Sequence, residues 1–364
     1  MNLKKYYLPF FILLLVIVLT ACADNSGMQS TATNENSDEI TVIDYLSREV
    51  AIPKEVDSIA CLYAYTGHVV TMLGDGDKIV AVNNGLKRDL LLHKINPAIK
   101  DAAVPHQGGK INIEELAHAN PDLILIQEST AQDEGEVRKL EELKIPYLVV
   151  NFNTMKEQQQ SIAMIGEALG KSEKAKQFND FYNEMIALVS ERVKDIPDED
   201  KVSVYHSVME ATRTDPAGSL PAEWLKVAGA INVSVGENLK LTESKYFASV
   251  EQILLWDPDV ILVNQDGVGD YILESPAWQT LKAVKANKVY QLPNGVSRWG
   301  HPGGLETPLA IVWTAKTLYP DRFADIDLEN ITKEFYEKFF NYKLSPDEIE
   351  QILSGKDMRT PKGN

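Results

Sequence analysis

Two stretches of the chain repeat each other: IEELAHANPDLILIQ at residues 113–127 and VEQILLWDPDVILVN at residues 250–264. Five residues of the first stretch recur 137 positions later, namely Glu114, Pro121, Asp122, Ile124 and Leu125. Apolar residues at i, i+3 and i+4 predict a short helix at the start of each stretch. Proline then ends the helix, and the uniformly apolar LILI or VILV is typical of a strand covered on both faces. The repeat therefore predicts an α/β sheet in each half of the chain.

The flanking sequence extends this repeat into two similar α/β lobes. Upstream, HVVTMLGDGDKIVAV and EWLKVAGAINVSV both predict a helix, a turn and an apolar segment. Downstream, EVRKLEELKIPYLVV and AWQTLKAVKANKVYQL both predict a helix that leads into a strand. We expect a first lobe over residues 40–170, a second lobe with terminal helices over 197–354, and a polar tail over 355–364.

One long amphipathic helix is predicted between the lobes, over residues 171–196. Its apolar residues follow the helical period, and Ser172 after Gly170 is the expected N-cap. About 24 residues rising 1.5 Å each would span about 36 Å, which is enough to join the two lobes and allow only a modest hinge. The alternative is a surface helix that belongs to one lobe.

The amino terminus has the composition of an export signal. Lys4 and Lys5 precede an uncharged stretch over residues 8–19, which is short for a membrane span and ends in Leu-Thr-Ala-Cys at 19–22. This ending resembles the lipobox of bacterial lipoproteins, which implies cleavage before Cys22 and acylation of its sulfur. The alternative is an ordinary secretory signal. Residues 23–39 are polar and predict a flexible tether.

Charge and cysteine content exclude several classes of protein. The 364 residues carry 36 basic and 53 acidic side chains, a formal net charge of −17, so a nucleic-acid partner is not expected. The chain has two cysteines, which excludes a disulfide scaffold. If Cys22 is acylated, Cys61 has no partner and is predicted to be a small core residue.

Ligand residues are expected where strands end, because ligands of open α/β sheets bind outside the carboxyl ends of the strands. Arg213 and Arg298 favour an anionic ligand, since the guanidinium fork matches oxyanions. His106 and His301 could donate to an anion or ligate a bound metal complex, whereas the aromatic residues could stack on a ligand or only pack. Glu306 is assigned to a helix terminus. The predicted ligand-binding residues are Tyr63, Tyr65, His106, Gln127, Arg213, Gln265, Arg298, Trp299 and His301.

Over about residues 40–320 the chain resembles the substrate-binding lipoproteins of ABC importers for ferric siderophores, haem, cobalamin and some oxyanions. The resemblance rests on the two helix-plus-strand segments containing Pro-Asp and on the long helix between them. In that family a glutamate seven residues before each proline docks onto arginines of the permease. Glu114 and Glu251 stand at that spacing, which implies that both are permease-docking residues. The alternative is that they are acidic residues favoured near helix amino termini.

The resemblance implies a monomeric extracytoplasmic receptor, held to the membrane by lipidated Cys22. It would capture an iron complex, a ferric siderophore by expectation, in a cleft between the lobes and deliver it to a permease and its ATPase. Such a receptor is not an enzyme and needs no cofactor. The alternatives are an oxyanion receptor for molybdate or tungstate, a haem or cobalamin receptor, a bare-metal receptor using His106, His206 and His301, and a tethered α/β enzyme. No motif of the GxSxG, P-loop, HExxH or GxGxxG type supports the enzyme.

Overall fold

The computed structural model describes residues 38–356 and 358–360. A compact unit begins at Asp38. The predicted signal sequence, Cys22 and nearly all of the predicted tether lie outside the described residues, so their assignment remains a prediction. Among the helices that are described, none is both long enough and apolar enough to cross a membrane.

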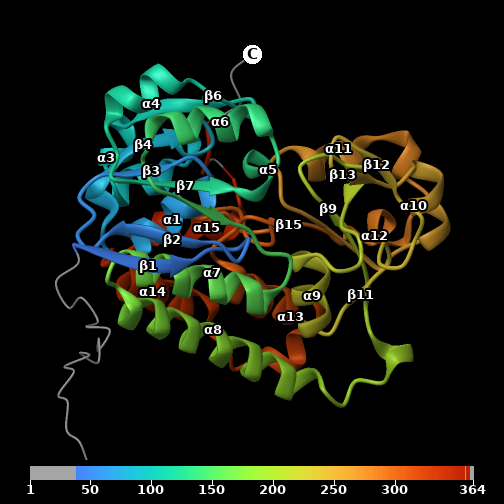
Figure 1. Ribbon diagram of the computed structural model, residues 1–364. Coiled ribbons are helices and arrows are strands. Elements are labelled where there is room, and N and C mark those ends of the chain that lie inside the picture. The colour runs from blue at the N-terminus through green and yellow to red at the C-terminus, as the bar shows by residue number, and fades with distance from the viewer. Residues whose placement is uncertain (1–37, 357, 361–364) are drawn as a thin grey trace, which may run out of the picture. The chain divides into compact units, whose positions relative to one another are not determined.

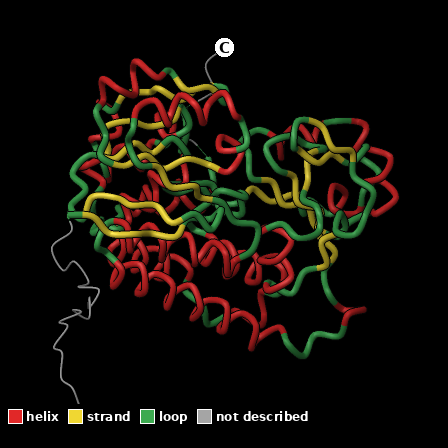
Figure 2. The backbone as a smooth tube through the Cα atoms, in the orientation of Figure 1, coloured by secondary structure: helices red, strands yellow, loops and turns green. Residues whose placement is uncertain are grey.

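The first lobe is built on a six-stranded sheet with the order β6-β5-β4-β3-β7-β8 (Figure 1). Five of these strands are parallel, and the edge strand β6 is antiparallel to β5. Helices lie on both faces of this sheet (Figure 2). The elements are the hairpin β1 (Glu39–Ile43) and β2 (Glu49–Pro53), β3 (Ile59–Cys61), α1 (Ala64–Met72), β4 (Ile79–Asn83), α2 (Leu90–Ile95), α3 (Ala98–Asp101), β5 (Ala103–Gln107), β6 (Lys110–Ile111), α4 (Ile113–Ala119), β7 (Leu123–Gln127), α5 (Glu128–Ala131), α6 (Glu134–Leu143), β8 (Tyr147–Val150) and α7 (Met155–Ala168).

The second lobe is built on a four-stranded parallel sheet with the order β11-β9-β14-β15. The segment between β9 and β14 also contains the strands of a small antiparallel sheet with the order β10-β13-β12. The elements are β9 (Ser203–Ser207), β10 (Arg213–Thr214), α9 (Leu220–Val227), β11 (Ile231–Asn232), β12 (Lys240–Thr242), β13 (Lys245–Phe247), α10 (Val250–Trp256), β14 (Val260–Val263), α11 (Val268–Glu274), α12 (Lys282–Lys285) and β15 (Val289–Gln291). Strand order reverses beside β3 in the first lobe and beside β9 in the second, which places a switch point in each sheet. The predicted α/β class with two similar lobes is confirmed.

The repeated segments form equivalent elements, as predicted. The first copy is helix α4 followed by β7, and the second is helix α10 followed by β14. Asn112 and Ser249 cap the two helices by accepting a backbone N–H with their side chains. Each helix ends at a left-handed residue, Asn120 with φ 47° and Asp257 with φ 42°, directly before the proline.

The long helix is α8 (Ser172–Val193), which has 22 residues and spans about 33 Å. Its N-cap is Lys171, so the prediction that Ser172 caps the helix was wrong; Ser172 is the first helical residue. Phe178 and Tyr182 are fully buried on its inner face. The helix contacts α7 of the first lobe and α9 of the second, and a single hydrophobic cluster continues through it from β3 to β14. The two lobes therefore share the main hydrophobic cluster around α8, while each lobe also has a smaller cluster of its own.

The chain ends with three helices, α13 (Thr307–Leu318), α14 (Leu328–Phe340) and α15 (Pro346–Ser354). Helix α14 contacts α1 of the first lobe, and Lys94 of α2 pairs with Glu348 of α15 at 2.8 Å. Residues 358–360 then form backbone hydrogen bonds with residues 88–90 of the first lobe. The tail predicted over 355–364 therefore begins with a bonded segment, and the terminal helices contact both lobes.

Candidate ligand-binding site

A cavity of about 230 Å³ lies where loops of both lobes meet. The first lobe contributes the turn after β3 and the loop before α2, and the second lobe contributes the turn after β9 and the loop over residues 297–303. The C-terminal segment adds one further residue. The cavity is lined by Tyr63, Ala64, Tyr65, His68, Gly85, Arg88, Asp89, Met209, Ser297, Arg298, His301, Gly303 and Arg359. A larger cavity of about 410 Å³ lies beside β1 and α7, and no predicted ligand residue lines it.

Arg298 is the most deeply buried cation of the site, with 8% of its surface exposed. One guanidinium nitrogen, Nη1, donates to Gln265 Oε1 at 2.7 Å. Burial, together with the charge of the nearby Arg359, lowers the pKa of Arg298 to about 9. A buried cation next to other cations is costly unless an anion compensates it, so this environment favours a negatively charged ligand.

His301 lies in the same loop as a neutral hydrogen-bonding group. Its Nδ1 accepts the backbone N–H of Gly303 at 3.0 Å, which leaves the proton of the neutral ring on Nε2. Burial lowers the pKa of His301 well below its ordinary value, and the charge of Arg298 acts in the same direction. The ring is therefore neutral at pH 7 and can donate one hydrogen bond.

Glu306 holds the loop that carries Arg298. Its carboxylate is fully buried and accepts the backbone N–H groups of Val296 and Ser297, each at 2.9 Å. It also accepts the hydroxyl of Tyr336 at 2.5 Å and that of Ser297. Although Glu306 precedes α13, its side chain makes no cap hydrogen bond there. The predicted role at the helix terminus is thus corrected to a role in positioning the loop.

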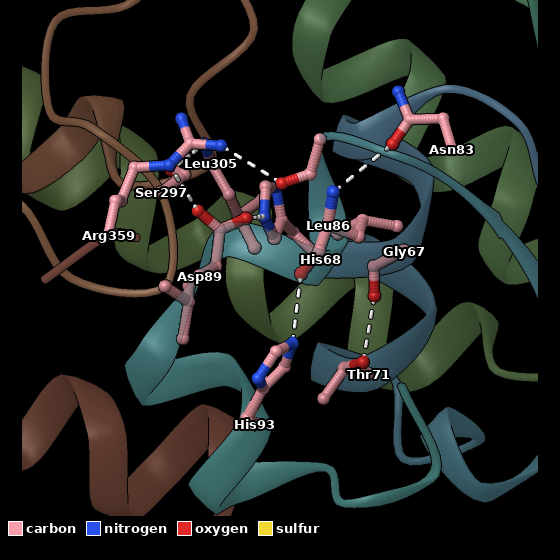
Figure 3. Close-up of polar contacts among 12 residues, drawn as sticks. Gly67, His68, Thr71, Asn83, Leu86, Asp89, His93, Ser297, Leu305 and Arg359 are labelled. Carbon is pink, nitrogen blue, oxygen red and sulfur yellow. Dashed lines mark hydrogen bonds and ion pairs between the residues drawn. The ribbon is translucent and has the colours of Figure 1, made fainter. Parts of the chain in front are cut away.

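An ion pair borders the cavity on the side of the first lobe. Asp89 has only 2% of its surface exposed. Its Oδ1 lies 2.8 Å from Arg359 Nε, and its Oδ2 lies 3.2 Å from His68 Nε2. Figure 3 shows Asp89 between these two side chains. Among the described residues that line the cavity, Asp89 is the one carboxylate, and Arg359 compensates its charge.

Two of the predicted aromatic residues are fully buried, and Tyr65 is the one of them that also lines the cavity. Trp299 has no exposed surface and belongs to the main hydrophobic cluster. Tyr65 is also fully buried; its ring lies 4.6 Å from that of Phe152, and its hydroxyl is 3.1 Å from Ser161 Oγ. Both rings pack in the main hydrophobic cluster, and a ligand role for them stays a prediction. Tyr63 is half-buried and lines the cavity.

The remaining predicted ligand residues are not among the described residues that line the cavity. Arg213 on β10 is half-buried and donates to Met209 Sδ at 3.3 Å, and its charge lowers the pKa of Arg298. Gln265 accepts a hydrogen bond from the guanidinium of Arg298. His106 on β5 and Gln127 on β7 are half-buried, and neither is among the described residues that line the cavity. A ligand role for these residues stays a prediction.

Three charged lining residues were missed by the sequence analysis: Arg88, Asp89 and Arg359. Arg88 and Asp89 follow a strand by several residues, beyond the segments that were searched. Arg359 lies in the predicted polar tail. Its position depends on pairing between residues far apart in the chain, and no local pattern reveals such pairing.

Groups of three or more His, Cys, Asp or Glu side chains that could hold a metal ion are absent from the described residues. His206 Nδ1 lies 2.5 Å from Asp215 Oδ2, and both residues are buried. The bare-metal alternative therefore has no ligand set within residues 38–356 and 358–360.

Glu114 and Glu251 occupy the first turns of α4 and α10. Both side chains are exposed. No ion pair involving either glutamate occurs within the part of the chain that the structure describes. The docking role implied for both residues stays a prediction.

Two α/β lobes on one long helix, with a charged cavity between their loops, are the architecture of a solute-binding protein. The chain belongs to the periplasmic binding protein family, whose sequence model matches residues 59–296. Proteins of this family are extracytoplasmic and work with the permease and ATPase of ABC importers. The relatives of the chain are solute-binding transport proteins and not enzymes.

Three relatives illustrate the similarity. The molybdate-binding protein MolA of Haemophilus influenzae is 25% identical over 331 residues, which cover 84% of this chain and 92% of MolA. The uncharacterized ABC transporter substrate-binding lipoprotein YvrC of Bacillus subtilis is 26% identical over 324 residues, which cover 86% of this chain and 97% of YvrC. The crystal structure of a periplasmic solute binding protein from Veillonella parvula is 26% identical, with a TM-score of 0.74, and covers 88% of this chain and 99% of that protein.

Proposed function

We propose that the cargo of this binding protein is a small oxyanion, with molybdate as the first candidate. The observation that carries the proposal is the cavity of about 230 Å³ bordered by Arg88, Arg298 and Arg359. In a chain with a formal net charge of −17, three arginines around one small cavity form a local positive site. An oxyanion would compensate their charges and accept their hydrogen bonds.

Neutral donors complete this site. His301 offers its Nε2 proton, and Tyr63 offers a phenol hydroxyl from the opposite lobe. Because donors come from both lobes, the bound anion would hold the lobes together. The similarity to MolA, whose name describes molybdate binding, supports the same class of ligand.

The ferric siderophore expected from the sequence is the alternative cargo. A cavity for a drug-sized ligand usually has a volume of about 300–1,000 Å³, whereas this one measures about 230 Å³. A bulky chelate would require the lobes to separate further than they do in the structure. The buried Tyr65 and Trp299 also leave less aromatic surface for a chelator than the sequence predicted.

The proposed receptor is attached to the membrane by lipidated Cys22 and docks through Glu114 and Glu251. The first part is supported by the lipobox-like sequence and by the lipoprotein relative YvrC. The second part is supported by the exposure of both glutamates on equivalent helices of the two lobes. Mass spectrometry of the membrane fraction would detect a diacylated amino-terminal cysteine if the attachment is correct.

Calorimetric titration of the purified protein tests the cargo. Molybdate, tungstate and sulfate are compared with ferric siderophores, haem and cobalamin. Wild-type protein is expected to bind an oxyanion, and Arg298→Gln is expected to weaken that binding about tenfold or more, because a hydrogen bond to a charged group contributes about 1.5–3 kcal/mol.

Arg138→Gln is the matched control, since Arg138 is exposed on α6 and far in sequence from every lining residue. It should bind as wild type does. Binding of a ferric siderophore or haem with no response to the oxyanions would reject the oxyanion proposal and restore the expectation from the sequence.

A further inference from the structure

Residues 358–360 lie against the first lobe. They belong to the segment that the sequence predicted as a polar tail. Leu90 donates its backbone N–H to Met358 at 3.1 Å, and Thr360 donates to the carbonyl of Arg88 at 3.0 Å. Arg88 Nε returns a bond to the carbonyl of Thr360 at 2.9 Å. These contacts form a short antiparallel pairing centred on Asp89 and Arg359. We call residues 358–360 the C-terminal strap.

Helix α15, which precedes the strap in the chain, is fixed next to the loop that carries Arg298. Asn294 donates its backbone N–H to the carbonyl of Ile352 in α15 at 2.9 Å. Helix α15 ends at Gly355, whose φ is 69°. A Cβ at this position would lie 2.3 Å from the carbonyl oxygen of Leu292, so only glycine allows this close turn. The strap therefore links the segment before Arg298 to the first lobe.

Burial of the strap shows that its placement is specific. Met358 has 4% of its surface exposed and belongs to the main hydrophobic cluster. The side chain of Arg359 is 16% exposed. An unattached polar tail would bury neither a methionine nor an arginine.

Arg359 is held by two of its guanidinium nitrogens. Nε lies 2.8 Å from Asp89 Oδ1, and Nη2 donates to the carbonyl of Gly85 at 3.0 Å. Figure 3 shows this arrangement beside His68. The third nitrogen, Nη1, makes no hydrogen bond to any residue that the structure describes, and the side chain lines the cavity together with Arg298 and His301.

We propose that the C-terminal strap is part of the ligand site and that Arg359 contacts the bound oxyanion directly. This inference rests on the proposed function, because it needs an anionic cargo. The anion would be bound by arginines from three separate parts of the chain: Arg88 in the first lobe, Arg298 in the second lobe and Arg359 in the strap. Two of them would be oriented before the ligand arrives, by Asp89 and by Gln265.

The alternative is that Arg359 only compensates the charge of Asp89 and does not contact the anion. Two variants separate these roles. Arg359→Gln removes the cation and leaves the Asp89 carboxylate facing the cavity. Asp89→Asn combined with Arg359→Gln removes both charges, so the local net charge stays as in wild type. If Arg359 contacts the anion directly, the affinity for the anion stays reduced in the double variant. If Arg359 only compensates Asp89, the double variant regains wild-type affinity.

The experiment is calorimetric titration with molybdate of the full-length wild-type protein, the two variants, Arg298→Gln and the exposed control Arg138→Gln. Thermal unfolding without ligand reports whether each variant is folded. We expect the dissociation constant to rise about tenfold or more in Arg359→Gln and to stay raised in the double variant. If Arg359→Gln alone does not fold, the double variant, which has no uncompensated buried charge, gives the result.

Wild-type affinity in the double variant, or in Arg359→Gln, would overturn the proposed contact. If Arg298→Gln weakens binding in the same series while the strap variants do not, the oxyanion function stands and the role of the strap fails. If wild-type protein binds no oxyanion, both proposals fail together.

Discussion

Asp122 and Asp259 recur in the two copies of the repeat because they perform the same local task. Asp122 Oδ2 accepts the backbone N–H groups of Asp57 and Ser58, each at 2.9 Å. Asp259 Oδ2 accepts the backbone N–H and the hydroxyl of Ser203, at 3.2 and 2.6 Å. Each carboxylate thereby joins the start of its own strand to the start of the neighbouring strand. The repeat was visible in the sequence, but the partners of these aspartates were not, since they lie more than fifty residues away.

Replacing both aspartates, Asp122→Ala with Asp259→Ala, should lower the free energy of unfolding at pH 7 by about 1–3 kcal/mol per site. Burial alone would raise the pKa of each carboxyl, but the N–H and hydroxyl donors outweigh burial, and both pKa values are lowered. A carboxyl with a lowered pKa stabilises the fold above its ordinary pKa, and this contribution is lost as pH falls through the native value.

Urea unfolding at several pH values measures both effects. Between about pH 5 and about pH 3, the range around the ordinary carboxyl pKa, wild type should lose more unfolding free energy than the double variant does. Asp321→Ala is the control, because Asp321 is exposed. Equal acid sensitivity in wild type and the double variant would contradict the assigned role.

Helix α8 is the element on which the two lobes depend. Phe178 is fully buried on it, and its ring lies 5.1 Å from that of Phe339 in α14. The sequence predicted this helix and its buried face because the apolar period of 3.6 is a local signal. The sequence did not predict that α14 packs against the same face. Phe178 and Phe339 lie about 160 positions apart in the chain, and a periodic pattern gives no information on contacts between such distant residues.

Phe178→Ala should cost about 3–5 kcal/mol of unfolding free energy, because the cavity left in a shared core cannot fully collapse. Phe178→Leu, which keeps most of the volume, should cost clearly less. Denaturant unfolding followed by far-ultraviolet circular dichroism should show one transition that moves as a whole. Two separate transitions, with only one of them shifted, would show that the lobes unfold independently and that α8 belongs to one of them.

At the scale of the whole molecule, Glu114 and Glu251 present one exposed carboxylate from each lobe. Glu114→Lys combined with Glu251→Lys is expected to leave the affinity for cargo unchanged and to abolish uptake by cells. The reason is that neither side chain lines the cavity, while reversed charge opposes a partner that carries arginines. Uptake of the bound anion and titration of the purified variant measure the two properties separately.

Glu142→Lys combined with Glu274→Lys is the matched control, since these exposed glutamates lie one in each lobe, on α6 and α11. The control should transport normally. Loss of ligand binding in the Glu114 and Glu251 variant would contradict the docking assignment.

The candidate site was predictable only in part. Arg298, Tyr63 and His301 follow predicted strands, so their residue types and positions indicated the cavity. Tyr65 and Trp299 were predicted from the same kind of position, yet both are fully buried, because burial depends on packing against residues distant in the chain. Arg88 and Arg359 depend on a pairing between distant segments, and a single sequence holds no record of that pairing.

The C-terminal strap has a practical consequence for work with this protein. An affinity tag fused directly after Thr360 would begin next to Arg359, whose side chain borders the cavity. A polyhistidine tag at that end would bring titrating imidazoles and bound nickel close to a pocket for anions, and it could report affinities that belong to the tag. A recombinant form that carries its tag in place of residues 1–22 avoids this artefact.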